Sequence, residues 1–412
     1  MRWKRYVIIV AADQRPGIFS NHTMRVLYIQ ASWVPPPQDP QADRFFLLSE
    51  TLEGDVLQPV WFHEPDQVEA EFGKGSYPEY NRGHFCFHWF LCFRPDGHRR
   101  RFGTFWFYLR KGLEIHRRRR YDCIVVYSHM GPALVAVLLK LLTGARLIVE
   151  VMTAPELSYL YEHPRRTLAD RLMRLFSDVS LHVSVWCSNR VHLLYPTQLA
   201  HYRFLRHTRA SVFHDFVPMS LIERSDEREK TVIFVGAPWY LKGVDLLIEA
   251  FRRVAREFPD VKLRIQGHFP DRAAFEALAA GEPQIEIVKA EPNPETIRRI
   301  SRALLLVHPS RCEGMGRVLL EAMGAGVAVL ASDAGGIPYY VDAGQTGILF
   351  PAGDSETLAK RLRELLANGE LRQRLGLRGY ELAHANYSER VYVDQFTRMV
   401  QAALSRGGAS SD

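Results

Sequence analysis

The chain is predicted to be an α/β protein with two doubly wound domains, each built on a parallel sheet. Short, continuous apolar runs alternate with segments of helical periodicity along most of its 412 residues. The alternation stops once, at the polar stretch IERSDEREK (222–230), and then restarts. A chain of this length also exceeds what one hydrophobic core accommodates. Because ligands of such sheets bind beyond the carboxyl ends of the strands, we expect the active site in a cleft between two facing domains.

The first domain is assigned to residues 1–220. It begins with YVIIVAA (6–12), a continuous apolar run typical of a strand buried on both faces. A helix is expected over SNHTMRVLYIQA (20–31). The remaining strands expected here are 54–62, 121–129, 146–152, 190–195 and 211–217, and the helices are 102–116, 132–142 and about 165–177.

The second domain is assigned to residues 221–390. Its expected strands are 231–237, 261–267, 285–290, 303–310 and 328–333, with a short element at 346–353. Its expected helices are 244–258, 271–280, about 294–302, 317–326 and 355–368. A last helix, at about 391–408, is expected to return and complete the first domain.

Composition favours a cytoplasmic protein without a membrane span. The longest apolar segment (131–149) is interrupted by Lys140 and Arg146, whereas a span needs roughly 20 consecutive apolar residues. The N-terminus has a short apolar run followed by Asp13, which favours a strand over a signal peptide. Five dispersed cysteines without a CxxC pair indicate free thiols and no zinc site.

Positive charge is concentrated in the first half. Residues 1–220 carry 28 Lys and Arg against 20 Asp and Glu, whereas residues 221–412 carry 25 against 26. The segment 84–120 interleaves aromatic residues with arginines. Its aromatic residues are either core or part of a peripheral face that contacts anionic membrane lipid. No nucleic-acid motif is present, so nucleic acid is not expected as a partner.

The most informative stretch is SRCEGMGRVLLEAMGAG (310–326), which follows a predicted strand and opens a helix. Its glycines expose backbone N–H groups at a helix N-terminus, which favours an anion such as phosphate. Glu313 lies among these groups, and Glu321 follows about two helical turns later on roughly the same face. One carboxylate can therefore meet a sugar and the other a ribose, although each alone also fits an ordinary helix-start or solvated glutamate.

From Pro309 to Asp354 the chain reads PSRCEGMGRVLLEAMGAGVAVLASDAGGIPYYVDAGQTGILFPAGD. This string resembles the signature of the retaining glycosyltransferases of family 4, which share an E-x7-E motif. IFVGAPWYLKGVDLLIEAF (233–251) resembles a second block of the same family. The resemblance covers most of the second half and implies the GT-B fold, in which two Rossmann-like domains face each other across a cleft.

The resemblance also implies roles for individual residues. Glu313 would be catalytic, close to the transferred sugar, and Glu321 would bind the ribose. Lys242 would neutralise the leaving diphosphate, with Gly236 in the preceding glycine turn. The backbone amides expected at the sugar hydroxyls are those of Gly314, Met315 and Gly316.

Two residues of the first half and one departure complete the predicted site. His129 ends a predicted strand, where the family often has a histidine facing the donor sugar. Gly17 occupies the place of a glycine loop near the donor phosphate, although a simple turn glycine is the other interpretation. Ala237 stands where the family usually has an arginine that shares the diphosphate with the lysine. Either another cation takes over that charge, with Arg317 as the first candidate, or the donor sits differently, or activity is impaired.

The function implied is transfer of a sugar, with retention, from a nucleotide-diphosphate sugar to a hydroxyl acceptor. Neither a metal nor another cofactor is expected, because a lysine and helix-end amides stabilise the leaving diphosphate. The acceptor is expected to be a saccharide or a lipid-linked saccharide, at the inner face of a membrane. The alternative is an impaired family member that acts as a scaffold in a glycan assembly complex. A dinucleotide-dependent oxidoreductase is disfavoured because no GxGxxG follows the first strand.

Overall fold

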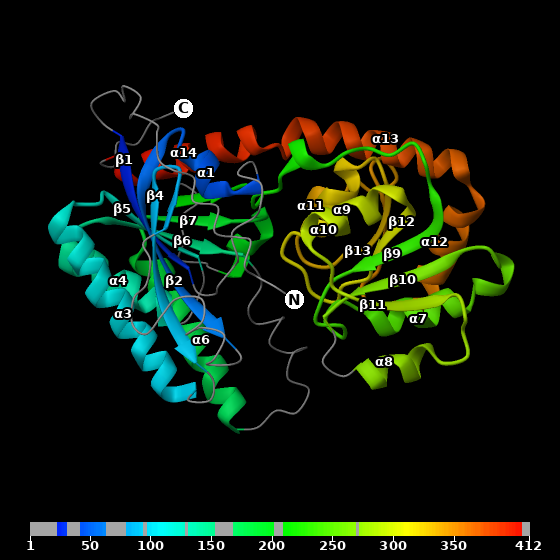
Figure 1. Ribbon diagram of the computed structural model, residues 1–412, viewed down its shortest axis with the longest axis horizontal. Helices are drawn as coiled ribbons and strands as arrows, with labels where there is room; N and C mark the ends of the chain where they lie inside the picture. The colour runs from blue at the N-terminus through cyan, green and yellow to red at the C-terminus, as the bar shows by residue number, and fades with distance from the viewer. Residues whose placement is uncertain are drawn as a thin grey trace. The chain divides into compact units, whose positions relative to one another are not determined.

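Two sheets organise the chain (Figure 1). The computed structural model describes residues 23–30, 42–62, 80–93, 97–127, 131–152, 168–201, 209–268 and 272–405. The predicted strand at 6–12 lies outside these residues.

The first sheet has eight strands in the order β3-β4-β2-β1-β5-β6-β7-β8. They are β1 (Met24–Gln30), β2 (Leu52–Phe62), β3 (Tyr80–Arg82), β4 (Phe85–Phe93), β5 (Cys123–Tyr127), β6 (Arg146–Val151), β7 (Arg190–Leu193) and β8 (Ala210–Val212). The short edge strand β3 pairs antiparallel with β4. The helices are α1 (Arg44–Leu48), α3 (Gly97–Arg118), α4 (Gly131–Thr143), α6 (Leu168–Cys187) and the last helix, α14 (Glu389–Leu404).

One predicted helix is wrong. The segment expected to be helical at 20–31 contains β1, which pairs in parallel with both β2 and β5. Val26 to Ile29 are each at most 1% exposed, because a central strand is covered on both faces. A strand buried in this way shows no period-2 alternation, so its pattern does not distinguish it from a buried helix.

The second sheet has six strands in the order β11-β10-β9-β12-β13-β14, and all of its neighbours are parallel. The strands are β9 (Glu229–Val235), β10 (Lys262–Gly267), β11 (Ile285–Lys289), β12 (Ala303–His308), β13 (Ala328–Ser332) and β14 (Ile348–Phe350). The helices are α7 (Val244–Arg252), α8 (Arg272–Ala279), α9 (Asn293–Arg302), α10 (Arg317–Gly324), α11 (Ile337–Tyr340), α12 (Ser355–Ala367) and α13 (Gly369–Asn386).

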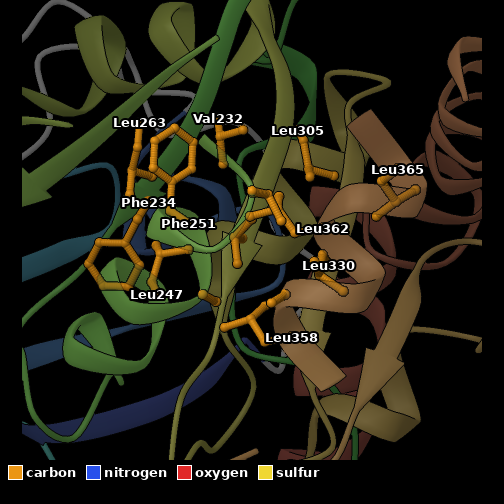
Figure 2. Close-up of a cluster of buried hydrophobic side chains, with 14 of the residues drawn as sticks. Val232, Phe234, Leu247, Phe251, Leu263, Leu305, Leu330, Leu358, Leu362 and Leu365 are labelled. Atoms are coloured by element: carbon orange, nitrogen blue, oxygen red, sulfur yellow. The ribbon is translucent and has the colours of Figure 1, made fainter. Parts of the chain in front are cut away.

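Helices α7 and α12 bury their apolar faces in the core of the second sheet. Leu247 and Phe251 of α7 and Leu358 and Leu362 of α12 are all at most 1% exposed. Figure 2 shows them among side chains of the sheet: Val232, Phe234, Leu263, Leu305 and Leu330. Close packing of this kind gives the ends of the strands, and the loops that leave them, a rigid support.

The chain divides into two compact units. The first contains Met1–Glu150, Ser180–His192 and Val393–Asp412, and the second contains Val151–Val179 and Leu193–Tyr392. The second unit therefore begins before the boundary at 220/221 that the sequence predicts. The reason is packing, since Val217, Met219 and Ile222 belong to the same core cluster as residues of α10 and β13. None of the helices in the described parts of the chain is long and apolar enough to cross a membrane.

The strand order identifies where each sheet should bind a ligand. From β9 the second sheet runs outward through β10 to β11, and from β12 it runs the other way through β13 to β14. The order thus reverses between the neighbours β9 and β12, and open parallel sheets bind ligands just beyond such a point. In the first sheet the reversal lies between β1 and β5.

Candidate functional site

The two loops that leave β9 and β12 bring Lys242 and Glu313 together at the reversal of the second sheet. Lys242 Nζ lies 2.6 Å from Glu313 Oε2, although the residues are 71 positions apart. The side chains are 18% and 10% exposed. The two residues predicted to meet the diphosphate and the sugar are thus adjacent, partly shielded from solvent and opposite in charge.

His308, the last residue of β12, completes this group. Its Nε2 lies 2.7 Å from Glu313 Oε2, and its ring stacks on Phe234 of β9. Its side chain is 3% exposed, so it holds Glu313 from the buried side. His308 was not among the predicted site residues. A polar residue at the carboxyl end of a predicted parallel strand, five positions before Glu313, was the signal available.

The environment favours the ionised form of Glu313. Burial raises the pKa of this carboxyl, but the Lys242 ammonium and the hydrogen bond from His308 outweigh burial and bring the pKa to about 2. Its other oxygen, Oε1, accepts a hydrogen bond from the Gly314 amide at 3.1 Å. Glu313 is therefore a fixed carboxylate with acceptor capacity at neutral pH.

Glycines permit the close approach of the loops around this group. At Gly243, φ is 70° and a Cβ atom would lie 2.0 Å from the Pro309 carbonyl oxygen. At Gly335, φ is 56° and a Cβ atom would lie 1.9 Å from the Glu313 carbonyl oxygen. Any larger residue would therefore force the backbone of Lys242 or of Glu313 to move.

A second ion pair joins the same two loops. Both terminal nitrogens of Arg311 donate to Asp245, at 2.8 and 2.7 Å. The Arg311 amide donates to the Leu241 carbonyl at 2.8 Å. Its guanidinium also lies over the Tyr240 ring. Arg311 was not predicted as a site residue, because its partner is 66 positions away.

Helix α10 begins directly after this loop. Gly316 precedes it with φ 72°, and Arg317 is its first residue. The Arg317 side chain is 46% exposed, and its Nη2 lies 3.8 Å from Glu321 Oε1. Burial raises the pKa of Glu321 above its ordinary value, and Arg317 opposes that rise. The helix start thus presents backbone N–H groups and a cation, both of which favour an anion.

Two other predicted site residues, Met315 and Gly236, make contacts inside the second unit. Met315 is 4% exposed and packs in the core, where its sulfur lies 3.3 Å from the Asp215 amide nitrogen. The Gly236 amide donates to the Gln266 carbonyl at 3.0 Å. His129 and Gly17 lie outside the described residues.

One group in the described part of the chain has side chains that could jointly hold a metal ion. It consists of Asp55, Cys86 and His88 in the first unit. Asp55 already pairs with Arg25 at 2.6 Å and with His88 at 2.8 Å. A metal cation here would lie beside the Arg25 guanidinium, so we interpret the group as a buried ion-pair network.

Comparison with known proteins places this site in context. Residues 220–382 match the model of the family described as glycosyl transferases group 1. The chain is 27% identical over 293 residues to N-acetyl-alpha-D-glucosaminyl L-malate synthase of Bacillus anthracis, covering 69% of this chain and 76% of that protein. The residues that match the family model, 220–382, include Lys242, Glu313 and Glu321.

Solved structures share the fold. Sucrose-phosphate synthase from Thermosynechococcus elongatus superposes with a TM-score of 0.72 at 17% identity, over 92% of this chain and 98% of that chain. Anabaena HepE, solved with UDP and glucose, superposes with a TM-score of 0.66 at 16% identity, over 92% and 99%. Residues 220–382 thus carry a group 1 glycosyl transferase domain, and the protein is a glycosyltransferase of the GT-B fold.

Proposed function

We propose that the protein transfers a sugar, with retention of configuration, from a nucleotide-diphosphate sugar to a hydroxyl acceptor. The observation that carries this proposal is the contact between Lys242 and Glu313 at the reversal of the second sheet. A cation and an ionised carboxylate fixed side by side suit a ligand that combines a diphosphate with sugar hydroxyls.

Each group at the site has a task in this proposal. The Lys242 ammonium has three donors, so it can keep its contact with Glu313 while it binds a phosphate oxygen. Glu313 accepts hydrogen bonds from hydroxyls of the transferred sugar. Glu321, further along α10, binds the ribose.

The leaving diphosphate needs more positive charge than Lys242 supplies. Ala237 carries no charge at the position where the family that this chain resembles usually has an arginine. Arg317 is the exposed cation at the start of α10, and the helix dipole favours an anion at the same place. We therefore assign the second phosphate contact to Arg317 and to the first amides of α10. With these groups in place the reaction does not call for a metal ion.

Retention follows if the acceptor hydroxyl attacks from the face of the sugar that the diphosphate leaves. The C1–O bond to the diphosphate breaks while the acceptor oxygen forms its bond to C1. The departing phosphate oxygen takes the acceptor's proton. The protein's contribution is then positioning and electrostatic stabilisation.

The acceptor is proposed to be a saccharide or a lipid-linked saccharide, in polysaccharide or glycolipid synthesis. The protein would act in the cytoplasm, at the inner face of a membrane. The excess of Lys and Arg over Asp and Glu in residues 1–220 supports contact with an anionic surface on the acceptor side.

The experiment that tests the reaction incubates purified protein with UDP-, GDP- and ADP-sugars and a panel of hydroxyl acceptors. The anomeric configuration of the product is then read by NMR. We expect transfer with retention, and we expect Glu313→Gln and Lys242→Ala each to abolish most of it while circular dichroism shows the fold intact. Unchanged rates in both variants would refute the site assignment.

The competing proposal is an impaired protein that serves as a scaffold, and Ala237 is the observation that favours it. It predicts neither turnover nor nucleotide binding with any donor. Calorimetric titration with UDP, GDP and ADP separates the two, because an enzyme without its correct acceptor still binds its nucleotide.

A further inference from the structure

Helix α6 carries a stripe of apolar side chains that face solvent. Its members follow helical spacing over about 21 Å of the helix. They are Leu172, Leu175, Phe176, Val179, Val183 and Trp186, and each is between 37% and 69% exposed. Single exposed apolar residues are common, but a continuous stripe of six marks an interaction surface.

The opposite face of α6 has the character expected of an outer surface. Ser177, Ser180 and Ser184 are at most 5% exposed, and they lie beside the buried Leu181 and Val185. Ser184 satisfies its hydroxyl within the helix, by donating to the Leu181 carbonyl at 2.9 Å. The helix thus packs inward with three serines beside Leu181 and Val185 and presents six large apolar residues outward, where an ordinary surface helix has polar ones.

The end of α4 lies beside the end of α6 and also carries exposed apolar residues. Lys140 of α4 donates a hydrogen bond to the Cys187 carbonyl at the end of α6. Next to Lys140, Leu141 and Leu142 are 74% and 57% exposed. Trp186, one position before Cys187, therefore lies at the same end as these two leucines.

A run of arginines lies at the same edge of the first sheet. The Arg146 amide donates to Asp122 at 2.9 Å, and the Asn189 amide donates to Leu147 at 2.7 Å. These bonds align the starts of β5, β6 and β7, which directly follow α3, α4 and α6. The exposed residues Arg117 to Arg120 end α3 and begin the turn to β5, and α3 packs against α4 (Figure 1). Glu114 and Glu53 pair with two of the four arginines, so the run keeps positive charge.

We infer that this surface, made of the α6 stripe, Leu141, Leu142 and the arginines at 117–120, docks on an anionic lipid bilayer. An in-plane helix with Trp and Phe on one face inserts at the headgroup level, and nearby arginines bind anionic headgroups. A second copy of the chain would bring an identical arginine run to the same surface, and like charges oppose that pairing. The inference stands apart from the transfer chemistry, because none of these residues is in the site of Lys242 and Glu313.

The test is co-sedimentation of the full chain with vesicles of phosphatidylcholine alone and of phosphatidylcholine with phosphatidylglycerol. We expect binding to the anionic vesicles only, and weaker binding at high salt. Leu142→Ser with Trp186→Ser should reduce the partition coefficient at least about tenfold. Arg117→Gln with Arg120→Gln should reduce it about 25-fold, since each arginine near the surface contributes about fivefold.

Matched controls come from the second unit. Leu377→Ser with Leu278→Ser removes two exposed leucines, and Arg256→Gln with Lys360→Gln removes two exposed charges. Both should leave vesicle binding unchanged. Absence of wild-type binding to anionic vesicles, or equal binding by all variants, would overturn the inference. So would a dimer in analytical ultracentrifugation that Trp186→Ser dissociates without any vesicle binding. A chain that binds vesicles but transfers no sugar would refute only the proposed reaction.

Discussion

Arg311 binds Asp245 through both terminal guanidinium nitrogens, and its Cζ lies 4.1 Å from the centroid of the Tyr240 ring. Tyr240 and Asp245 lie on either side of Lys242 in the chain, whereas Arg311 lies two residues before Glu313. The bidentate pair therefore holds the loop of the lysine in register with the loop of the carboxylate. Only a planar guanidinium both bridges a carboxylate in this way and stacks on a ring.

The first prediction concerns this pair. Arg311→Lys keeps the charge but loses the bidentate geometry, so Lys242 should be displaced from its place beside Glu313. We expect kcat/KM for sugar transfer to fall between about 10-fold and 100-fold, as for other misplaced catalytic groups. Asp245→Asn should act in the same direction and less strongly.

Arg256→Lys serves as the control for the arginine substitution, because Arg256 is exposed in the same unit. It should leave kcat/KM unchanged. If Arg311→Lys lowers the melting temperature but transfers sugar at the wild-type rate, the pair stabilises the fold without positioning Lys242.

The second prediction concerns pH. The pKa of Glu313 is about 2 in the folded protein against an ordinary 4.5. A depressed pKa gives stability that is complete above the ordinary value and is lost as pH falls toward the folded value. Between about pH 5 and pH 2 the wild type should therefore lose about 3 kcal/mol of unfolding free energy that Glu313→Gln does not lose.

Urea unfolding at several pH values measures this difference. Hydrogen exchange of the strand amides of the second unit monitors the unfolding. Glu381→Gln is the control, since this carboxylate is exposed in the same unit. Parallel pH curves for the wild type and Glu313→Gln would show that the Lys242 contact does not depress the pKa of Glu313.

The sequence predicted the second half better than the first. Residues 303–326 follow a strand-turn-helix pattern that contains several glycines and two glutamates, Glu313 and Glu321. Local chemistry alone therefore indicated a site there. Lys242 was assigned by resemblance, and the structure places its ammonium beside Glu313. In the first half, β1 was mistaken for a helix because both patterns are continuous apolar runs when a segment is buried on every side.

The two residues that were missed depend on contacts that the folded loops create. His308 matters because Glu313 turns back toward the end of β12, and Arg311 matters because Asp245 approaches from another loop. The place of His308 near the end of a predicted strand was a local signal for the first contact, whereas the approach of Asp245 has none, since it is created by the order of strands in the sheet. Positions of this kind become visible only when the sheet is assembled.

The third prediction concerns the missing family arginine. If Arg317 supplies the second phosphate contact, Arg317→Gln should weaken binding of the preferred nucleoside diphosphate about tenfold, because it removes a charge-assisted hydrogen bond. Isothermal titration calorimetry measures the change. Arg298→Gln removes an exposed arginine from α9 and should leave the affinity unchanged. Equal affinity for the wild type and Arg317→Gln would move the phosphate contact elsewhere.

The last prediction concerns a buried pair in the first unit. Glu150 is 1% exposed, and its Oε1 lies 3.0 Å from Nδ1 of the fully buried His192. The Tyr28 hydroxyl donates to the other oxygen of Glu150. Glu150→Ala would leave His192 and Tyr28 without this acceptor, so the first unit should lose about 3 kcal/mol of stability. Glu150→Gln keeps one carbonyl acceptor and should lose less.

Hydrogen exchange of the β6 and β7 amides reports the free energy of opening at these strands. Lys230→Ala, which breaks the exposed pair with Asp260, should leave that exchange unchanged. If Glu150→Ala exchanges no faster than Lys230→Ala, the buried pair does not stabilise the sheet, because its desolvation cost then equals what its contacts contribute.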